Sequence, residues 1–383
     1  MRKSSNWLAT AFLSLFLSPA ITATAEQDTP VSKVSSIAME LDARIPALME
    51  AAEVPGLSLA VVENGEVIWS RIYGMASVEL ERPMATNTIL EAASLGKVVF
   101  ALITLRLADQ GIIDLDESIA KDFTYPLLDH DARFAELTPR LILQHASGLP
   151  NWGGYALNKE RDPVQFKGSP GEGYGYSGEA YTALQSFVEN RTGRGLEELF
   201  VDLAKEAGMT HSSFLSFKSH TDLYAQALRR DGTERTVFAF DWPGSAYSLL
   251  STAEDLVRFM AFYFSGGGLS NSAFKESLRS FNPVAEDAWG ANIPTGADIS
   301  WTLAWGAQEI DRRRTYFHGG NNGEFRSFFA FSGDRQTGVA LMTNGAGGLS
   351  FMSEIFNPFI GNITPAAVWW AYEAPPEGDA SEN

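Results

Sequence analysis

A serine and a lysine three residues apart, Ser94 and Lys97, begin an apolar run in the segment Ala93-Ser94-Leu95-Gly96-Lys97. Residues i and i+3 share one face of a helix, so the hydroxyl and the amine can meet. A serine hydroxyl is a weak nucleophile, and a neighbouring amine can accept its proton once desolvation has lowered the lysine pKa. A helix start also offers unpaired backbone N–H groups to an oxyanion. The pair is therefore a candidate nucleophile and proton acceptor.

Two further segments carry side chains that suit the same site. Tyr176 lies in a turn-rich stretch, residues 170–179, which leads into a predicted helix. His318 ends a β-prone stretch and is followed by Gly319 and Gly320, so a substrate backbone could lie along this strand. The Ser-x-x-Lys spacing alone is short, and its alternative is a helix start with an exposed lysine. Tyr176 and His318 favour a catalytic site.

The elements that must position these residues follow from the apolar patterning. Helical spacing predicts helices, at residues 37–52, 94–110 and 253–264. Runs of β-prone residues predict strands, at residues 57–62, 67–73, 302–310, 315–318, 325–331 and 339–343. Asn64-Gly65 favours a tight hairpin turn between the first two strands. Strands at both ends of the chain, around a helical middle, predict an α+β fold. In this fold an antiparallel sheet is flanked by helices and carries an inserted, mostly helical lobe.

The first 25 residues have the pattern of a secretory signal peptide. Met1-Arg2-Lys3 precedes an apolar run from Trp7 to Leu17, and Ala23-Thr24-Ala25 supplies a cleavage site. The protein is therefore expected to be periplasmic or secreted after cleavage near Ala25. The predicted domain covers residues 26–373, with an acidic tail at 374–383. Within it we expect a sheet lobe and a helical lobe, at about 32–85 with 240–373 and at about 86–239.

Composition excludes several classes of function. The chain of 383 residues has no cysteine, which excludes thiol catalysis and disulfides, and its formal charge of −18 disfavours nucleic acid as a partner. No later apolar run is long enough for stable membrane insertion. The histidines lack metal-ligand spacing, and the Gly-x-Gly-x-x-Gly match at residues 173–178 follows no apolar strand. We expect no metal and no other cofactor.

Taken together, these motifs resemble those of serine β-lactamases and penicillin-binding proteins. The resemblance is to the branch that contains class C β-lactamases, D-Ala-D-Ala carboxypeptidases, D-aminopeptidases and esterases, and it covers most of the chain after residue 25. Six segments match in the family's order: residues 56–62, 94–97, 145–150, 170–179, 248–256 and 318–320. The resemblance implies a β-lactamase/transpeptidase-like fold.

The resemblance also implies a role for each site residue. Ser94 would attack a carbonyl group and form an acyl-enzyme, and Lys97 would assist proton movement. Tyr176 would act as a general base or proton relay, and His318 would occupy the substrate-facing strand. The backbone N–H groups of Ser94 and Asn321 would form the oxyanion hole. The predicted substrate-binding residues are Gly319, Gly320, Asn321 and Trp152. For Trp152, packing in the core is the alternative.

Two departures from the family pattern bear on activity. The second motif is often Tyr-x-Asn, whereas this chain has Tyr176-Ser177-Gly178 and lacks the amide. The third is often Lys-Thr-Gly in β-lactamases, whereas this chain has His318-Gly319-Gly320, and a neutral histidine binds a carboxylate less strongly than lysine. Both departures argue against a dedicated β-lactamase.

The sequence therefore predicts an exported serine hydrolase that cleaves a small amide, peptide or ester through an acyl-enzyme on Ser94. Two alternatives stay open at this point. The chain could be a non-catalytic binding or scaffold protein on the same fold, or an acyltransferase that passes the acyl group to an acceptor other than water. The patterning does not specify an oligomeric state.

Overall fold

The computed structural model describes residues 33–153, 162–216, 221–238, 242–284 and 297–370. The predicted signal peptide, residues 1–25, and the predicted acidic tail, residues 374–383, lie outside these ranges. Within the described residues, none of the helices combines the length and the apolar character that crossing a membrane requires.

Nine antiparallel strands form one sheet from the two ends of the chain. The strand order is β3-β2-β1-β13-β12-β11-β10-β9-β8. The first part of the chain supplies β1 (Gly56–Glu63), β2 (Glu66–Ser77) and β3 (Arg82–Pro83). The last part supplies β8 (Asn282–Pro283), β9 (Asp298–Trp301), β10 (Gly306–Ile310), β11 (Arg313–Asn322), β12 (Phe325–Ser332) and β13 (Thr337–Thr343). Because β1 pairs with β13, the first and last parts of the chain meet inside one antiparallel sheet, which confirms the predicted α+β class.

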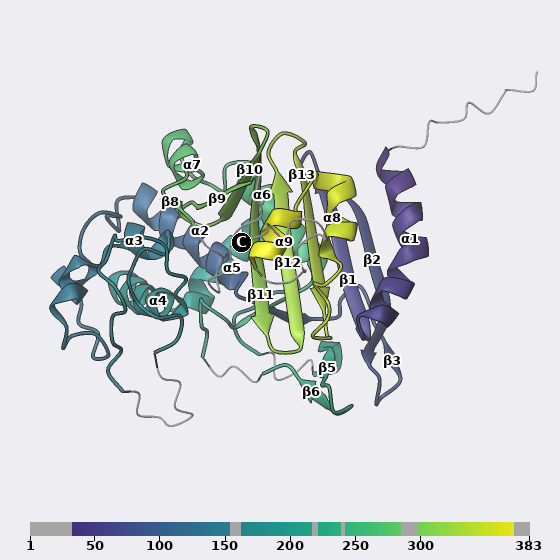
Figure 1. The fold of residues 1–383 in the computed structure, drawn as a ribbon. Helices are drawn as coiled ribbons and strands as arrows, with labels where there is room; N and C mark the ends of the chain where they lie inside the picture. The colour runs from purple at the N-terminus through teal and green to yellow at the C-terminus, as the bar shows by residue number, and fades with distance from the viewer. Residues whose placement is uncertain (1–32, 154–161, 217–220, 239–241, 285–296, 371–383) are drawn as a thin grey trace, which may run out of the picture.

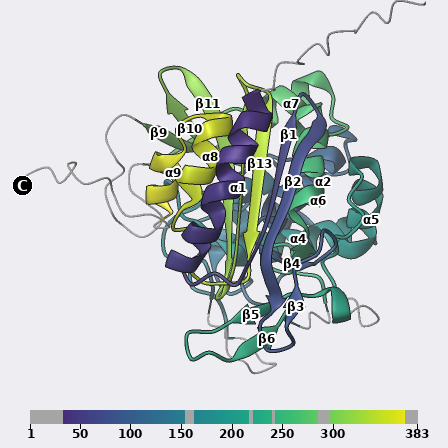
Figure 2. The ribbon, with the colours of Figure 1, turned by 90° about the vertical axis from the view of Figure 1, so that its right-hand side faces the viewer.

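Helices cover both faces of this sheet, as Figures 1 and 2 show. Successive residues of a strand point to opposite faces. On β1, Leu59 and Val61 pack with the helices α1 (Lys33–Ala51), α8 (Met352–Ile360) and α9 (Thr364–Trp369), whereas Ala60 and Val62 pack into a second core. That second core is shared with α2 (Gly96–Asp109) and α6 (Ala253–Phe264).

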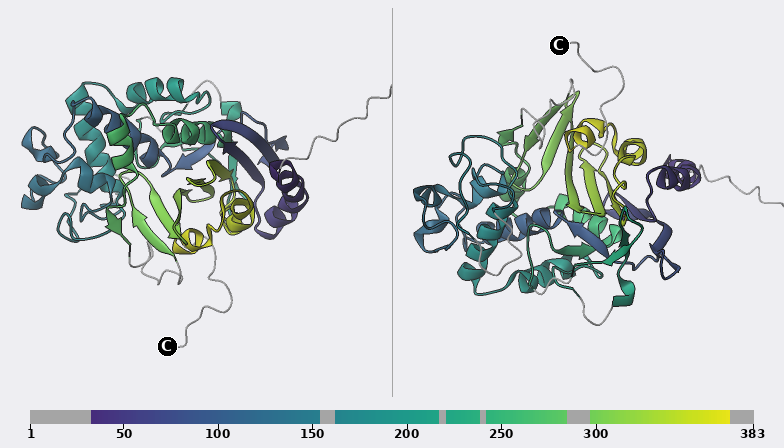
Figure 3. Two further views of the ribbon diagram at one scale, coloured as in Figure 1. Left: turned by 90° about the horizontal axis from the view of Figure 1, so that it is seen from above. Right: turned by 60° about the horizontal axis from the view of Figure 1, so that its bottom comes forward.

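The remaining elements lie beside the second face of the sheet, and Figure 3 shows them from two further directions. Two short β-ladders pair β4 (Leu90–Ala93) with β7 (Leu249–Ser251) and β5 (Gln226–Leu228) with β6 (Glu234–Thr236). The helices here are α3 (Pro139–Leu143), α4 (Gly178–Thr192), α5 (Leu196–Ala207) and α7 (Asn271–Ser277). Their apolar side chains pack into the same second core as α2 and α6.

The sequence predicted the hairpin of β1 and β2 correctly, but it predicted the bounds of β10 wrongly. Asn64 and Gly65 have φ values of 51° and 85°, as a tight primed turn between β1 and β2 requires. The predicted continuous strand at 302–310 is wrong, because residues 302–305 form a turn between β9 and β10. The Thr302 hydroxyl accepts the N–H groups of Ala304 and Trp305 at 3.2 and 2.9 Å, which favours the turn over an extended chain.

Candidate active site

Ser94 lies in a two-residue connection between β4 and α2. The predicted helix start at Ser94 is wrong by two residues, because α2 begins at Gly96. Ala93 has a φ of 52°, a left-handed conformation that is uncommon for a residue with a side chain. Such backbone conformations cost about 1–3 kcal/mol and concentrate at functional sites. The Lys97 N–H donates to the Ser94 carbonyl at 3.0 Å, and this turn brings the two side chains together.

The side chains of Ser94 and Lys97 meet at the carbonyl oxygen of Ala246. Lys97 Nζ donates to Ser94 Oγ at 3.0 Å and to Ala246 O at 2.7 Å, and Ser94 Oγ lies 3.2 Å from the same carbonyl. The sequence reasoning missed Ala246. Ala246 lies two residues before the matched segment at 248–256, and this position was the only sequence feature that could have indicated it. Every residue has a backbone carbonyl, so the residue type does not show which carbonyl accepts a hydrogen bond.

Lys97 is fully buried, and burial lowers the pKa of its amine well below the usual value of 10.5. Nζ lies 4.8 Å from the centre of the Tyr176 ring, 5.8 Å from that of Trp152 and 5.9 Å from that of Tyr181. Aromatic faces favour an ammonium ion by about 0.5–2 kcal/mol each. Because the pKa is nevertheless lowered, desolvation outweighs them, and a lowered pKa suits an amine that must accept a proton.

Tyr176 is positioned by the start of α4 and by His145. Ser177 caps α4 by accepting the Ala180 N–H at 2.9 Å, and its own N–H donates to Nδ1 of His145 at 3.2 Å. The imidazole lies 4.4 Å from the Tyr176 ring, centre to centre. Burial lowers the pKa of His145 well below its usual value, so this histidine acts as a neutral support for the tyrosine.

His318 lies on β11 and is completely buried. Its Nδ1 is 2.8 Å from the Gly319 carbonyl, so in the neutral ring Nδ1 carries the hydrogen and Nε2 is an acceptor. Burial, followed by the charge of Lys97, lowers its pKa to about 3. The imidazole packs 5.5 Å from Trp301 and 5.6 Å from Trp370. An uncharged histidine among indoles cannot form an ion pair with a substrate carboxylate at neutral pH.

Strand β11 passes very close to β4, which carries the chain toward Ser94. The Ser327 hydroxyl donates to the Ala92 carbonyl at 2.7 Å. A Cβ added to Gly320 would lie 2.2 Å from Ser327 Oγ and 2.3 Å from Ala92 O. Gly320 is therefore required for this approach. The next residue, Asn321, accepts the Gly323 N–H at 3.0 Å and an Arg326 N–H through its side chain.

Gly320→Ala should lower both stability and activity. Overpacking of this kind costs about 1–3 kcal/mol of unfolding free energy. It would also push Asn321 away from β4, and a misplacement of roughly 1 Å at a reacting centre costs about 100-fold in rate. Chemical denaturation and steady-state kinetics measure the two effects. Gly333→Ala is the matched control, because the added Cβ would meet its nearest neighbour at 3.9 Å. Equal unfolding free energies and equal rates for Gly320→Ala and Gly333→Ala would contradict the prediction.

A buried carboxylate, Glu91, ties β4 to the loop that carries Ala246. Its oxygens accept from Arg235 at 2.8 Å and from the Asn322 amide at 2.7 Å. The same amide donates to the Tyr247 carbonyl at 3.1 Å. Burial raises the Glu91 pKa although Arg235 opposes the shift. Sequence reasoning missed this network, since its members are far apart in the chain.

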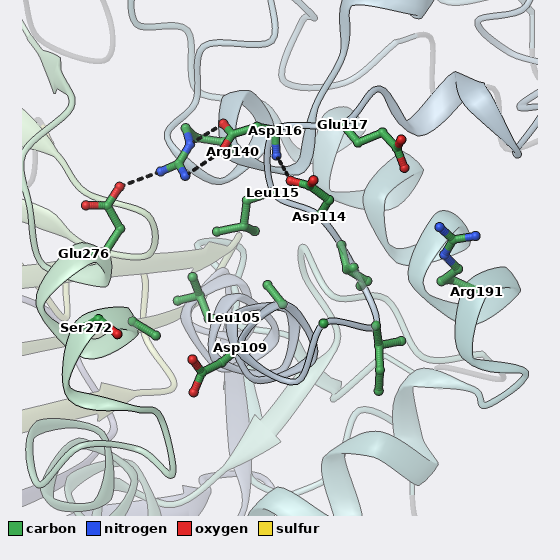
Figure 4. Close-up of a pocket in the computed structure, with 15 residues that line it drawn as sticks. Leu105, Asp109, Asp114, Leu115, Asp116, Glu117, Arg140, Arg191, Ser272 and Glu276 are labelled. Atoms are coloured by element: carbon green, nitrogen blue, oxygen red, sulfur yellow. Dashed lines mark hydrogen bonds and ion pairs between the residues drawn. The ribbon is translucent and has the colours of Figure 1, made fainter.

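A second pocket, drawn in Figure 4, lies at the opposite end of α2 and is about 650 Å³ in volume. A helix of this length spans roughly 20 Å, so the pocket is remote from Ser94. Arg140 at its edge donates twice to Asp116, at 2.6 and 2.9 Å, and once to Glu276, at 2.8 Å. Arg140 is therefore already paired with two carboxylates of this pocket. The Ser94 site remains the stronger candidate.

Comparisons with known proteins identify the family and the fold of this chain. The sequence model of the Beta-lactamase family matches residues 41–355. "Protein flp" of Staphylococcus aureus (strain NCTC 8325 / PS 47) is 22% identical over 321 residues, covering 80% of this chain and 62% of the relative. The chain thus spans about three fifths of that relative's length.

Solved structures share the fold at low sequence identity. An octameric penicillin-binding protein homologue from Pyrococcus abyssi has a TM-score of 0.68 at 22% identity, covering 81% of this chain and 74% of that one. A class C beta lactamase has a TM-score of 0.69 at 19% identity, covering 83% and 95%. The predicted β-lactamase/transpeptidase-like fold is therefore confirmed. This chain therefore belongs to the Beta-lactamase family.

Proposed function

We propose that this protein is an exported serine hydrolase that forms an acyl-enzyme on Ser94 and cleaves a small amide, peptide or ester. The observation that carries the proposal is the 3.0 Å contact between Ser94 Oγ and the amine of Lys97, which is buried and has a lowered pKa. Export is proposed because residues 1–25 have the pattern of a signal peptide.

The proposed reaction has two steps. In the first, the Ser94 hydroxyl proton passes to the Lys97 amine while Oγ bonds to the substrate carbonyl carbon. The C–O or C–N bond to the leaving group then breaks, and the leaving group takes the proton. In the second, water attacks the acyl carbon and gives a proton to the Lys97 amine. The bond between the acyl carbon and Ser94 Oγ breaks, the acid leaves, and Oγ takes that proton back from Lys97. Tyr176, whose ring lies 4.8 Å from Lys97 Nζ, would relay the proton, and the N–H groups of Ser94 and Asn321 would bind the oxyanion.

The substrate class follows from the charges near the nucleophile. His318 is neutral at physiological pH, and Gly178 offers no side-chain amide. A class C beta lactamase and a "D-alanine Carboxypeptidase AmpC from Burkholderia cenocepacia" share the fold, so amide chemistry lies within its range. Within that range, the site supports uncharged esters and amides better than substrates that must be held by a carboxylate.

Mass spectrometry of the intact protein tests the nucleophile. After incubation with a fluorophosphonate or p-nitrophenyl acetate, we expect one covalent adduct, located by peptide mapping on Ser94. Nitrocefin, a β-lactam with a carboxylate, is the third probe, and the neutral His318 predicts a weaker reaction with it. The fluorophosphonate adduct should be stoichiometric, because a phosphonylated serine is not released by water on the same timescale.

The same experiment separates hydrolysis from the alternatives. A protein that binds ligands without reacting would show no adduct with any of the three probes, and this result would refute the proposal. An acyltransferase would form the adduct but give a new ester or amide when an alcohol or amine is added. Product analysis by mass spectrometry distinguishes that outcome from release of the free acid.

A further inference from the structure

The indole of Trp152 rests directly on Gly178, the first residue of α4. A Cβ added to Gly178 would lie 2.5 to 2.8 Å from three carbons of the Trp152 six-membered ring. Contacts this short do not occur, so any side chain at position 178 would displace the indole. Trp152 can therefore occupy its position only because residue 178 is a glycine.

Three hydrogen bonds hold the backbone around Trp152 against the start of α4. The Gly178 N–H donates to the Asn151 side chain at 3.0 Å, and the Glu179 N–H donates to the Asn151 carbonyl at 2.9 Å. On the other side of the tryptophan, the Gly153 N–H lies 3.3 Å from a Glu179 carboxylate oxygen. Because both neighbours of Trp152 are fastened to α4, the indole is held in position before any substrate binds.

Trp152 forms one end of an aromatic strip at the edge of the Ser94 site, which consists of Trp152, Tyr247 and Trp242. The Trp152 and Tyr247 rings meet edge to face with their centres 5.9 Å apart, and Trp242 Nε1 donates to the Tyr247 hydroxyl at 2.9 Å. Trp152 and Trp242 are 36% and 69% exposed. A contiguous apolar patch at the surface can mark a ligand-binding groove.

The strip is continuous with the catalytic groups. Lys97 Nζ lies 5.8 Å from the centre of the Trp152 ring, and Tyr247 directly follows Ala246, whose carbonyl accepts from Lys97. An acyl group attached to Ser94 could therefore contact the aromatic strip. The three members of the aromatic strip are themselves uncharged, so their side chains offer a carboxylate or ammonium group no partner of opposite charge.

We propose that the aromatic strip Trp152, Tyr247 and Trp242 binds the apolar acyl group of the substrate, and that Gly178 is the glycine that lets Trp152 occupy this position. The inference rests on the proposed acyl-enzyme function and specifies its substrate class. The protein would prefer esters or amides of medium-chain or aryl acids over those of acetic acid, since a longer acyl chain buries more apolar surface on the indoles.

The test is the acyl-chain selectivity of the full-length protein. We take as selectivity the ratio of kcat/KM for p-nitrophenyl octanoate to kcat/KM for p-nitrophenyl acetate. The wild-type ratio should exceed one, and Trp152→Ala should lower it about tenfold, the equivalent of ~1.4 kcal/mol of lost contact. Trp152→Phe should restore part of the ratio. Leu80→Ala removes an apolar side chain that is 67% exposed on the turn before β3, and it should leave the ratio unchanged.

A double-mutant cycle tests the link to Gly178. Gly178→Ala should lower the selectivity ratio by displacing the indole, although alanine favours a helix more than glycine does. In the Trp152→Ala background the same change should have no further effect on the ratio. Additive effects would mean that Gly178 acts independently of Trp152, and would overturn that half of the inference.

Fluorophosphonate labelling keeps the two proposals distinguishable. If Ser94 is labelled in wild type and in Trp152→Ala while the selectivity ratio does not change, the acyl-binding inference is wrong and the nucleophile assignment stands. If labelling is also lost in Trp152→Ala, the tryptophan only supports the catalytic groups, and the inference is again wrong. If wild type is not labelled at all, the proposed function itself fails.

Discussion

Ser94→Ala should abolish turnover of every substrate while leaving the thermal midpoint nearly unchanged. Removal of a catalytic serine lowers kcat by roughly 10⁴-fold or more, because no other group takes over the nucleophilic step. The cost in stability is small, since the hydrogen bonds of the hydroxyl within the described part of the chain go to Lys97 and Ala246, and a typical hydrogen bond contributes about 1 kcal/mol. Lys97 also keeps its 2.7 Å bond to the Ala246 carbonyl.

Steady-state kinetics with p-nitrophenyl acetate and thermal unfolding followed by circular dichroism check both parts of this prediction. Ser350→Ala is the matched control, because Ser350 is an exposed serine before α8 whose hydroxyl contacts only its own turn. That control should retain wild-type turnover. Turnover by Ser94→Ala at more than a few per cent of the wild-type rate would show that another residue carries the reaction.

Lys97→Met should lower kcat by about 10²- to 10⁴-fold, the range attributed to general acid–base groups. Methionine matches the length of the lysine stem and fits a fully buried position, so the loss would report the amine and not a cavity. Lys205→Met, which changes an exposed lysine on α5, is the control and should leave kcat unchanged. If Lys97→Met retains wild-type kcat, the amine is not the proton acceptor.

The pH dependence of kcat in the wild-type protein follows from the Lys97 amine. Only the neutral amine accepts a proton, so kcat should fall as the pH falls through the lowered pKa of Lys97. The pKa values of the neighbouring His145 and His318 are lowered as well, first of all by burial.

Stability should follow the same linkage. Between the lowered pKa of Lys97 and its usual value of 10.5, the unfolded chain holds a proton on this lysine and the folded chain does not. The free energy of unfolding therefore rises as the pH rises across that window, and this gain in stability is lost as the pH falls back through it. Lys97→Met should remove this slope. Denaturant titrations of both proteins at a series of pH values measure the difference, and parallel curves would contradict a depressed Lys97 pKa.

Several parts of the fold and site could be predicted because the signals are local. The Asn64-Gly65 turn requires two residues with positive φ, and the chain supplies two that tolerate it. Ser177 and Thr252 each cap a helix near its predicted start. The spacing of Ser94 and Lys97 brought the two side chains within 3.0 Å even though the helix starts two residues later.

By itself, the sequence determined the fold class, the order of the motifs and the Ser94 and Lys97 pair, because short-range spacing and apolar periodicity act within a few residues of the chain. Only the tertiary structure decided what surrounds that pair. Ala246 lies 149 residues from Lys97, and Glu91 lies 144 residues from Arg235. The burial that lowers the Lys97 pKa comes from packing between segments distant in the chain. The same packing places Trp152 on Gly178, a contact that neither residue type alone predicts.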